Sequence, residues 1–232
     1  MQIKSMLSYC LNRYKKILGT SIIVYAVTAV LVFLLELKKV QMNSVFSLVG
    51  SMVLIIISLS YQDEFFDVSL ANSVSRKTST ISIFIMGLVF SLSNALITIV
   101  CEYAMEKFCI NGVYTASPLI TLTNGNKLSF VGNLILQLSV YFSIVMIFFV
   151  MGIMKKRLNK ILVALIWIAM FGSMNYCASI INSVYDLMCK RLSFDLSKTG
   201  NTIAFFCACS FVLGIIYFLF ARRCPCQSSS KK

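Results

Sequence analysis

Long apolar stretches separated by short polar segments dominate the hydropathy pattern of the chain. Six of them reach the length of about 20 residues that an α-helix needs to cross the hydrocarbon core of a bilayer. They run over Ile17–Glu36, Asn43–Gln62, Ile81–Cys101, Ser129–Gly152, Ile161–Asn182 and Thr202–Ala221. The pattern therefore predicts an all-α membrane protein with six transmembrane helices, forming a single domain over residues 1–232.

The first 16 residues have apolar side chains at helical spacing but are too short and too basic to form a span. Ile3, Leu7, Leu11 and Tyr14 recur at three- and four-residue steps, with basic and polar residues between them. This periodicity favours an amphipathic helix that lies in the cytosolic headgroup layer. An ordinary flank before the first span is the alternative.

The segment 63–80, between the second and third stretches, also has the spacing of an amphipathic helix. Phe66, Leu70 and Val74 follow one another at four-residue steps. Acidic residues precede this ridge and basic residues follow it, which complements the helix dipole. Such a short helix offers an apolar ridge to the groove of a partner protein. A helix that lies on the membrane surface without a partner remains an open alternative.

Basic residues are distributed unequally between the two sides of the predicted bundle. The chain has 21 Lys and Arg against eight Asp and Glu. Of the 21 basic residues, 14 fall in the segments 1–16, 63–80, 153–160 and 222–232. The positive-inside rule therefore predicts that both termini are cytosolic. The net charge of +13 mainly indicates the topology of the chain. Attraction of the basic residues to anionic lipid is a secondary consequence.

Composition excludes several classes of protein. With 59% apolar and 12% charged residues, the chain is neither a soluble domain nor a nucleic-acid reader. It contains no histidine, and none of its carboxylates lies at the middle of a span, which argues against catalysis within the membrane. It also lacks the GxxxxGK[ST] motif of a phosphate-binding loop. We therefore expect no enzymatic activity, cofactor or metal in this chain.

Nine cysteines are scattered along the chain without a CxxC pair, and most such residues are small buried hydrophobes. A disulfide between Cys109 and Cys189 in outward segments is conceivable, although no spacing supports it. The run Cys224-Pro225-Cys226 follows the last span. Two thiols cannot complete a tetrahedral zinc site, so incidental thiols or a lipidated cysteine are the two interpretations.

Four amides lie within the predicted spans: Asn94, Asn133, Gln137 and Asn175. In hydrocarbon, such groups form hydrogen bonds between helices, each contributing about 1 kcal/mol. They are candidates for a weakly polar translocation path, and interhelical contacts without a transport role are the alternative.

The layout, together with the run Asn72–Thr78 (NSVSRKT) before the third span, resembles the membrane subunit of bacterial ATP-binding-cassette exporters of the type-two permease family. A similar (N/G)-x-S-R-K run occurs there in small permeases. The resemblance implies that residues 1–16 form a connecting helix. It also implies that Asp63–Ser75, within the cytosolic segment 63–80, forms a coupling helix that docks on an ATPase, with Phe65 and Phe66 as its anchors. The implied docking residues are Asp63, Glu64, Phe65, Phe66, Asp67, Leu70, Arg76 and Lys77.

The same resemblance implies a location in the bacterial plasma membrane and a set of partners. Two permease chains, identical or related, would pair with two separately encoded ATPases, which bind ATP and Mg²⁺. Family members of this size export amphipathic or antimicrobial peptides or confer immunity to them, and others in the family move lipids or drugs.

Other classes of protein remain as alternatives. The substrate-binding membrane subunit of a vitamin importer carries an Ala-x-x-x-Ala face in its first span, whereas Ala26 and Ala29 are three positions apart here. A membrane enzyme conflicts with the missing histidine and mid-span acids. An accessory membrane protein without transport activity is the third alternative.

Overall fold

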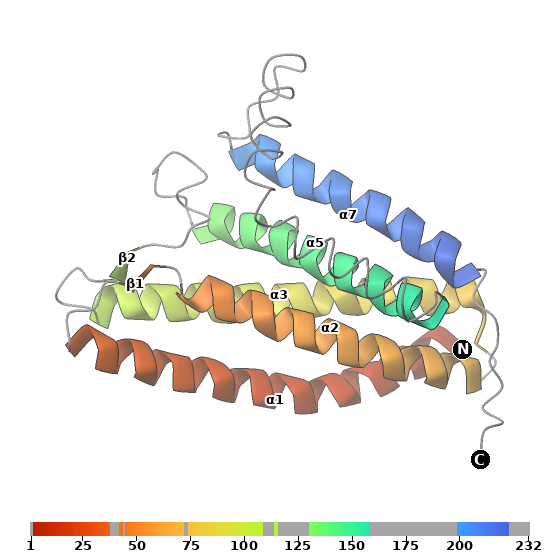
Figure 1. Ribbon diagram of the computed structural model, residues 1–232, viewed down its shortest axis with the longest axis horizontal. Helices are drawn as coiled ribbons and strands as arrows, with labels where there is room; N and C mark the ends of the chain where they lie inside the picture. Colours follow the sequence, from red (N-terminus) through yellow and green to blue (C-terminus); the bar gives the residue numbers. More distant parts are fainter. Residues whose placement is uncertain are drawn as a thin grey trace.

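The computed structural model describes residues 2–37, 42–43, 45–71, 74–108, 114–115, 130–157 and 199–222. These residues form five long helices and two very short strands (Figure 1). In chain order the elements are α1 (Gln2–Leu37), β1 (Met42–Asn43), α2 (Val45–Ala71), α3 (Arg76–Phe108), β2 (Tyr114–Thr115), α5 (Phe130–Arg157) and α7 (Thr199–Arg222).

The five helices are each long and apolar enough to cross a bilayer. Their spanning portions are Ile17–Leu34, Val45–Gln62, Arg76–Met105, Phe130–Lys156 and Gly200–Arg222. Five of the six predicted spans are thereby confirmed as long apolar helices, and the predicted span Ile161–Asn182 lies outside the described residues. The chain is a multi-pass helical membrane protein.

Contacts between helices fix the direction in which each one runs. The C-terminal parts of α2, α5 and α7 meet around Gln62, because Gly152 lies against its side chain and Tyr217 bonds to its amide. The N-terminal residue of α3, Arg76, contacts the end of α7 at Ala221. Helices α5 and α7 therefore run in the same direction, antiparallel to α3 (Figure 1).

The helices differ in how much of their apolar surface the bundle covers. In α5, 61% of the spanning residues are buried, whereas the figure is 17% for both α1 and α7. Exposed aliphatic side chains such as Ile23, Val30, Val212 and Leu219 cover these two helices. Helix α5 is therefore the centre of the bundle, and α1 and α7 present their apolar residues to lipid.

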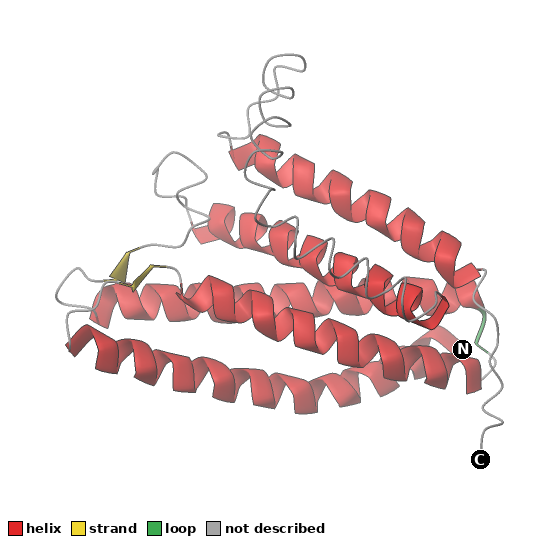
Figure 2. Ribbon diagram, in the orientation of Figure 1, coloured by secondary structure: helices red, strands yellow, loops and turns green. Residues whose placement is uncertain are grey.

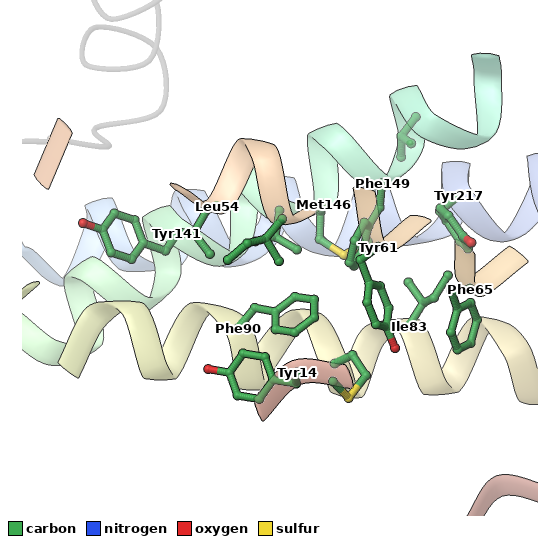
Figure 3. Close-up of a cluster of buried hydrophobic side chains, with 14 of the residues drawn as sticks. Tyr14, Leu54, Tyr61, Phe65, Ile83, Phe90, Tyr141, Met146, Phe149 and Tyr217 are labelled. Carbon is green, nitrogen blue, oxygen red and sulfur yellow. The ribbon is translucent and has the colours of Figure 1, made fainter. Parts of the chain in front are cut away.

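Aromatic side chains fill the middle of the bundle (Figure 3). The ring of Tyr61 on α2 lies edge-on to Phe90 of α3, with centroids 5.0 Å apart, and packs against Phe149 of α5 at 6.3 Å. Phe65, one turn further along α2, stacks on Tyr61 at 5.5 Å. Such edge-to-face and offset pairs add to the energy of burial itself.

Helix α1 differs from the prediction of a separate interfacial helix over residues 1–16. It runs without a break from Gln2 to Leu37. Tyr14 is buried in the aromatic core, where its ring lies 5.0 Å from Phe90, near the middle of α3. An apolar stripe fits a helix bundle as well as a lipid surface, and periodicity alone cannot distinguish the two.

Helix α2 also differs from prediction, because it continues nine residues beyond the expected end of the span, to Ala71. The expected coupling segment 63–80 is therefore divided between the last turns of α2 and the start of α3. We call residues 63–77 the α2–α3 corner. The Ser75 hydroxyl accepts a hydrogen bond from the Thr78 amide (3.2 Å), which is the N-cap that starts α3. The Val74 amide donates to the Ser69 carbonyl (3.0 Å) across the end of α2.

The two strands are an addition that the hydropathy pattern did not predict. Met42 pairs with Tyr114 and Asn43 with Thr115 in a parallel arrangement. Figure 2 shows this pair in yellow, at the end of the bundle opposite the α2–α3 corner. It links the segment between α1 and α2 to the segment that follows α3.

Candidate functional site

Two stripes of polar residues face each other inside the half of the bundle remote from the α2–α3 corner. On α3 they are Asn94, Thr98 and Glu102, and on α5 they are Asn133, Gln137 and Tyr141, each at four-residue steps. Because residues four apart lie on the same face of a helix, each stripe presents its side chains in one direction. Tyr25 of α1 and Ser47 of α2 join them by hydrogen bonds. We call these eight residues the polar cluster.

Hydroxyl groups form one half of the polar cluster. The Tyr25 hydroxyl donates to Asn94 Oδ1 (3.1 Å) and lies 2.8 Å from Thr98 Oγ1. Thr98 Oγ1 is in turn 3.1 Å from the Tyr141 hydroxyl, which donates to the Ser47 carbonyl at 3.4 Å. This chain of hydrogen bonds joins α1, α2, α3 and α5.

A carboxylate forms the other half. Glu102 is only 8% exposed, although it lies within the spanning part of α3. The Ser47 hydroxyl donates to Glu102 Oε1 (2.7 Å), and Gln137 Nε2 donates to Glu102 Oε2 (3.1 Å). Hydrogen bonds to a carboxylate are stronger than those between neutral groups, particularly where water is excluded. The bonds from α2 and α5 therefore hold this carboxylate in a defined position.

A glycine makes room for the hydroxyl groups. A Cβ atom at position 50 of α2 would lie 2.5 Å from the Tyr141 hydroxyl oxygen and 2.6 Å from that of Tyr25. Neither distance is compatible with a side chain, so Gly50 allows both tyrosines to reach the backbone of α2. Small residues at helix contacts have this role in membrane bundles.

A smaller polar contact involves Tyr217, which lies at the end of the aromatic core opposite Tyr141 (Figure 3). Gln62 Nε2 donates to the Tyr217 hydroxyl (3.0 Å), and that hydroxyl lies 3.4 Å from Gln62 Oε1. Nearby, Arg76 Nη1 donates to the Ala221 carbonyl (2.6 Å) at the end of α7. A cation at this position also complements the C-terminal dipole of α7. We call the Gln62–Tyr217 and Arg76–Ala221 contacts the inner clasp.

The structure brings together three of the four amides predicted to line a translocation path. Asn94, Asn133 and Gln137 are buried on facing sides of α3 and α5. Asn175 lies outside the described residues. Asn94 bonds to Tyr25 and Gln137 bonds to Glu102, so these two amides belong to the hydrogen-bonded part of the cluster, whereas Asn133 Oδ1 has no partner within the described residues.

The predicted ATPase-docking residues all lie in the α2–α3 corner, with different exposure. Glu64 and Lys77 are exposed and Arg76 is partly buried in the inner clasp. Phe65 is 1% exposed and belongs to the aromatic core, so it does not present an anchor to a partner in this conformation. The side chains of Asp63, Phe66, Asp67 and Leu70 are outside the described set, although their backbone belongs to α2.

Cysteines contribute no bridge within the part of the chain that the structure describes. Cys101, Cys207 and Cys209 are free thiols. Cys109, Cys189, Cys224 and Cys226, which sequence analysis singled out, lie outside the described residues. Among the described residues, no three His, Cys, Asp or Glu side chains gather closely enough to hold a metal ion.

Sequence reasoning missed most of the polar cluster. It identified the amides but not Tyr25, Thr98, Tyr141 or Gly50, and it classed Glu102 with carboxylates at the ends of spans. The four-residue spacing of polar residues in both the third and fourth predicted spans was the available signal. Each stripe is too sparse to alter the mean hydropathy of its span.

The polar cluster is rich in hydrogen-bond acceptors. Within the described part of the chain, Gln137 Oε1 and Asn133 Oδ1 are buried without a hydrogen-bond partner. Each of these two amide oxygens can accept a hydrogen bond.

The fold and this site define the chain as a multi-pass helical membrane protein with a buried acceptor-rich cluster between its spans. No family model, curated protein or solved structure matches the chain.

Proposed function

We propose that the chain is the permease subunit of an ATP-driven exporter, which moves amphipathic peptides or similar hydrophobic substrates outward through the bilayer. The observation that carries the proposal is the α2–α3 corner. It lies at the end of the bundle that is richest in basic residues, and it is bonded to α7 through Arg76.

The geometry of the corner suits the transmission of force. Only four residues separate the end of α2 from the start of α3, and the Ser75 N-cap and the Val74–Ser69 bond fix the residues just before α3. A push against the corner therefore acts on two long helices directly and on α7 through the Arg76–Ala221 contact. The same helices α2 and α3 carry Ser47 and Glu102 at the other end. Docking at the corner can in this way alter the polar cluster, about 30–40 Å away at 1.5 Å per helical residue.

The proposal assigns ATP and Mg²⁺ to separate cytosolic subunits. Two ATPases and two permease chains would form the complete exporter, with the corner of each permease on one ATPase. In this arrangement the N-terminal end of α1 and the C-terminal end of α7 face the cytosol. These ends lie beside the corner (Figure 1).

Co-purification with ATPases encoded by neighbouring genes tests the proposal. We expect a complex with two copies of each subunit, in which ATP turnover rises when amphipathic peptides are added. Charge reversal at the exposed corner residue, Lys77→Glu, should reduce association at least tenfold. Lys107→Glu is the matched control, because Lys107 is an exposed lysine in the last turn of the same helix at the opposite end.

Two results would refute this function. One is that none of the neighbouring ATPases associates with the wild-type chain. The other is that Lys77→Glu and Lys107→Glu affect association equally, which would remove the corner as the docking surface. A complex that forms but does not respond to any amphipathic peptide would retain the permease role and redirect the substrate towards lipids or drugs.

A further inference from the structure

We infer that the ends of α3 and α7 beside the inner clasp form a binding site for an anionic phospholipid, whose headgroup is held by Lys77 and Arg222. This lipid site is additional to the proposed transport path and does not depend on the transported substrate. It consists of two exposed cations at the same level of the membrane and an exposed apolar stripe next to each of them.

The contact between Arg76 and Ala221 places the two cations at the same level. Arg76 Nη1 donates to the Ala221 carbonyl at 2.6 Å, and Lys77 and Arg222 are the next residues on the two helices. They are the second residue of one spanning portion and the last residue of the other. The ends of transmembrane helices lie in the headgroup layer of a bilayer. Both cations are therefore at the depth of lipid phosphate groups.

Helix α5 covers one side of the contact between α3 and α7. The Phe84 ring of α3 lies against Gly214 of α7. The Phe142 ring of α5 packs against Phe84, with centroids 6.5 Å apart, and Ser143 Oγ of α5 lies 2.8 Å from Ser210 Oγ of α7. The exposed residues of α3 and α7 therefore flank this contact on its other side, which faces lipid.

An exposed apolar stripe borders the contact on each helix. The members are Ile81 and Leu88 on α3, and Phe211 and Phe218 on α7. On each helix they lie three positions before and four positions after the residue that makes the helix contact, Phe84 or Gly214. Residues three and four apart are neighbours on one face of a helix. Both stripes therefore run beside the α3–α7 contact.

The stripes have the length of the acyl chains in one leaflet. Each begins four residues from its cation and ends eleven residues from it, counted from Lys77 on α3 and from Arg222 on α7. Eleven residues cover about 16 Å at 1.5 Å per residue, and one leaflet supplies about half of a hydrocarbon core of roughly 30 Å. A phospholipid whose phosphate lies at the two cations can thus lay its chains along both stripes.

The charge at this position is positive and accessible. Lys77 and Arg222 are exposed, and neither side chain forms a hydrogen bond or an ion pair with another described residue. Glu64, the acidic corner residue whose side chain the structure describes, belongs to α2. That helix packs on α3 at Phe90, which is nine residues from Ile81 and so on the opposite side of α3. Basic residues between spans at the membrane surface attract anionic headgroups.

Native mass spectrometry of the purified full-length chain tests the site. The chain in non-ionic detergent is given equal amounts of phosphatidylglycerol and phosphatidylcholine with the same acyl chains, and the bound lipids are counted. We expect wild type to retain phosphatidylglycerol at least tenfold over phosphatidylcholine. Lys77→Gln or Arg222→Gln should each lower this ratio roughly fivefold, as expected for one cation near a lipid surface. The double variant should show a ratio below twofold.

Control variants separate this site from the total charge of the chain. Lys15→Gln removes an exposed lysine of α1, at the opposite edge of the bundle from α7 (Figure 1), and should keep the wild-type ratio. Arg222→Lys keeps the charge and should also keep the ratio. All of these side chains are exposed, so the substitutions leave the core intact.

A photoreactive lipid locates the acyl chains. Phosphatidylglycerol with a diazirine in one acyl chain should form crosslinks to the two stripes, at Ile81–Leu88 and Phe211–Phe218, in preference to the exposed aliphatic residues of α1. The double variant should lose these crosslinks, whereas Lys15→Gln should retain them.

Several results would overturn the inference. They are equal retention of the two lipids by wild type, an unchanged ratio in the double variant, an equal loss in Lys15→Gln, and crosslinks spread evenly over α1 and α7. The assay contains no ATPase, and Arg222 is not one of the predicted ATPase-docking residues. Failure of the lipid site therefore leaves the permease role standing, and failure of ATPase association leaves the lipid site standing.

Discussion

The polar cluster and the inner clasp lie at opposite ends of one aromatic core, and they use polar groups in different ways. In the clasp, the Gln62 amide and the Tyr217 hydroxyl contact each other at both polar atoms of the amide. In the cluster, Gln137 Oε1 and Asn133 Oδ1 are buried without a hydrogen-bond partner in the described part of the chain. The first arrangement is complete as a helix contact, whereas the second leaves two buried amide oxygens without a donor there. Burial alone does not distinguish them, because Gln62 and Tyr217 are as fully buried as Gln137 and Tyr141.

The largest expected loss of stability comes from adding a side chain at Gly50, next to the hydroxyls of Tyr25 and Tyr141. Gly50→Ala places a methyl group against the Tyr25 and Tyr141 hydroxyls, which must move away from Thr98 and the α2 backbone. We expect a loss of about 2–3 kcal/mol, from steric overpacking together with broken interhelical hydrogen bonds. Thermal or denaturant unfolding of the detergent-solubilised chain measures this change in the free energy of unfolding.

The control for this substitution is Gly19→Ala on α1, where no atom lies within 4 Å of the added Cβ. There we expect a gain of about 0.5–1 kcal/mol, because alanine favours helix over glycine. If Gly50→Ala and Gly19→Ala change the free energy of unfolding equally, the two tyrosines do not pack closely against Gly50. Partial recovery of stability when Tyr25→Phe is combined with Gly50→Ala would support it.

An intermediate loss of stability is expected from substitutions at the inner clasp. Gln62→Met and Tyr217→Phe each remove one partner of a single interhelical contact, so each should cost about 1 kcal/mol. The double variant should cost little more than either single one, since both act on the same bond. Additive losses in this double-mutant cycle would show that the two residues stabilise the bundle separately.

The smallest effect is expected between the two regions, at Ser58 of α2. Its hydroxyl is fully buried and has no hydrogen-bond partner among the described residues. Ser58→Ala should therefore change stability by less than about 0.5 kcal/mol, or raise it slightly, because no hydrogen bond is lost. A loss above about 1 kcal/mol in the same unfolding assay would indicate that this hydroxyl makes a contact comparable to those of the clasp.

The sequence predicted the long helices well because their signal is a property of whole segments. Twenty apolar residues in a row determine a span whatever they pack against, and five such helices are present. The ends were less predictable. Helix α2 continues to Ala71 because its last turns still bury Phe65 and Ser69 in the bundle, although the acidic residues there had suggested the end of a span.

The candidate site was predictable only in part, for a different physical reason. Asn133 and Gln137 are conspicuous in an apolar helix, so hydropathy analysis identified them. Tyr25 and Tyr141 are amphipathic and were counted with the apolar residues, and the importance of Gly50 depends on side chains from two other helices. Glu102 is buried because α2 and α5 pack around α3 and bond to its carboxylate. The sequence around Glu102 alone does not predict this packing.

The two ends of the bundle are completed at different times during synthesis, because the last bonded residue of each end lies at a different position in the chain. Every member of the polar cluster has been made once residue 141 has left the ribosome, whereas Gln62 must wait for Tyr217, which is 155 positions later. Tyr217 follows residue 141 by 76 positions, so at about 5–20 residues per second the second end is completed roughly 4–15 s after the first. The newborn protein thus completes the polar cluster early and lacks the inner clasp until α7 has been made.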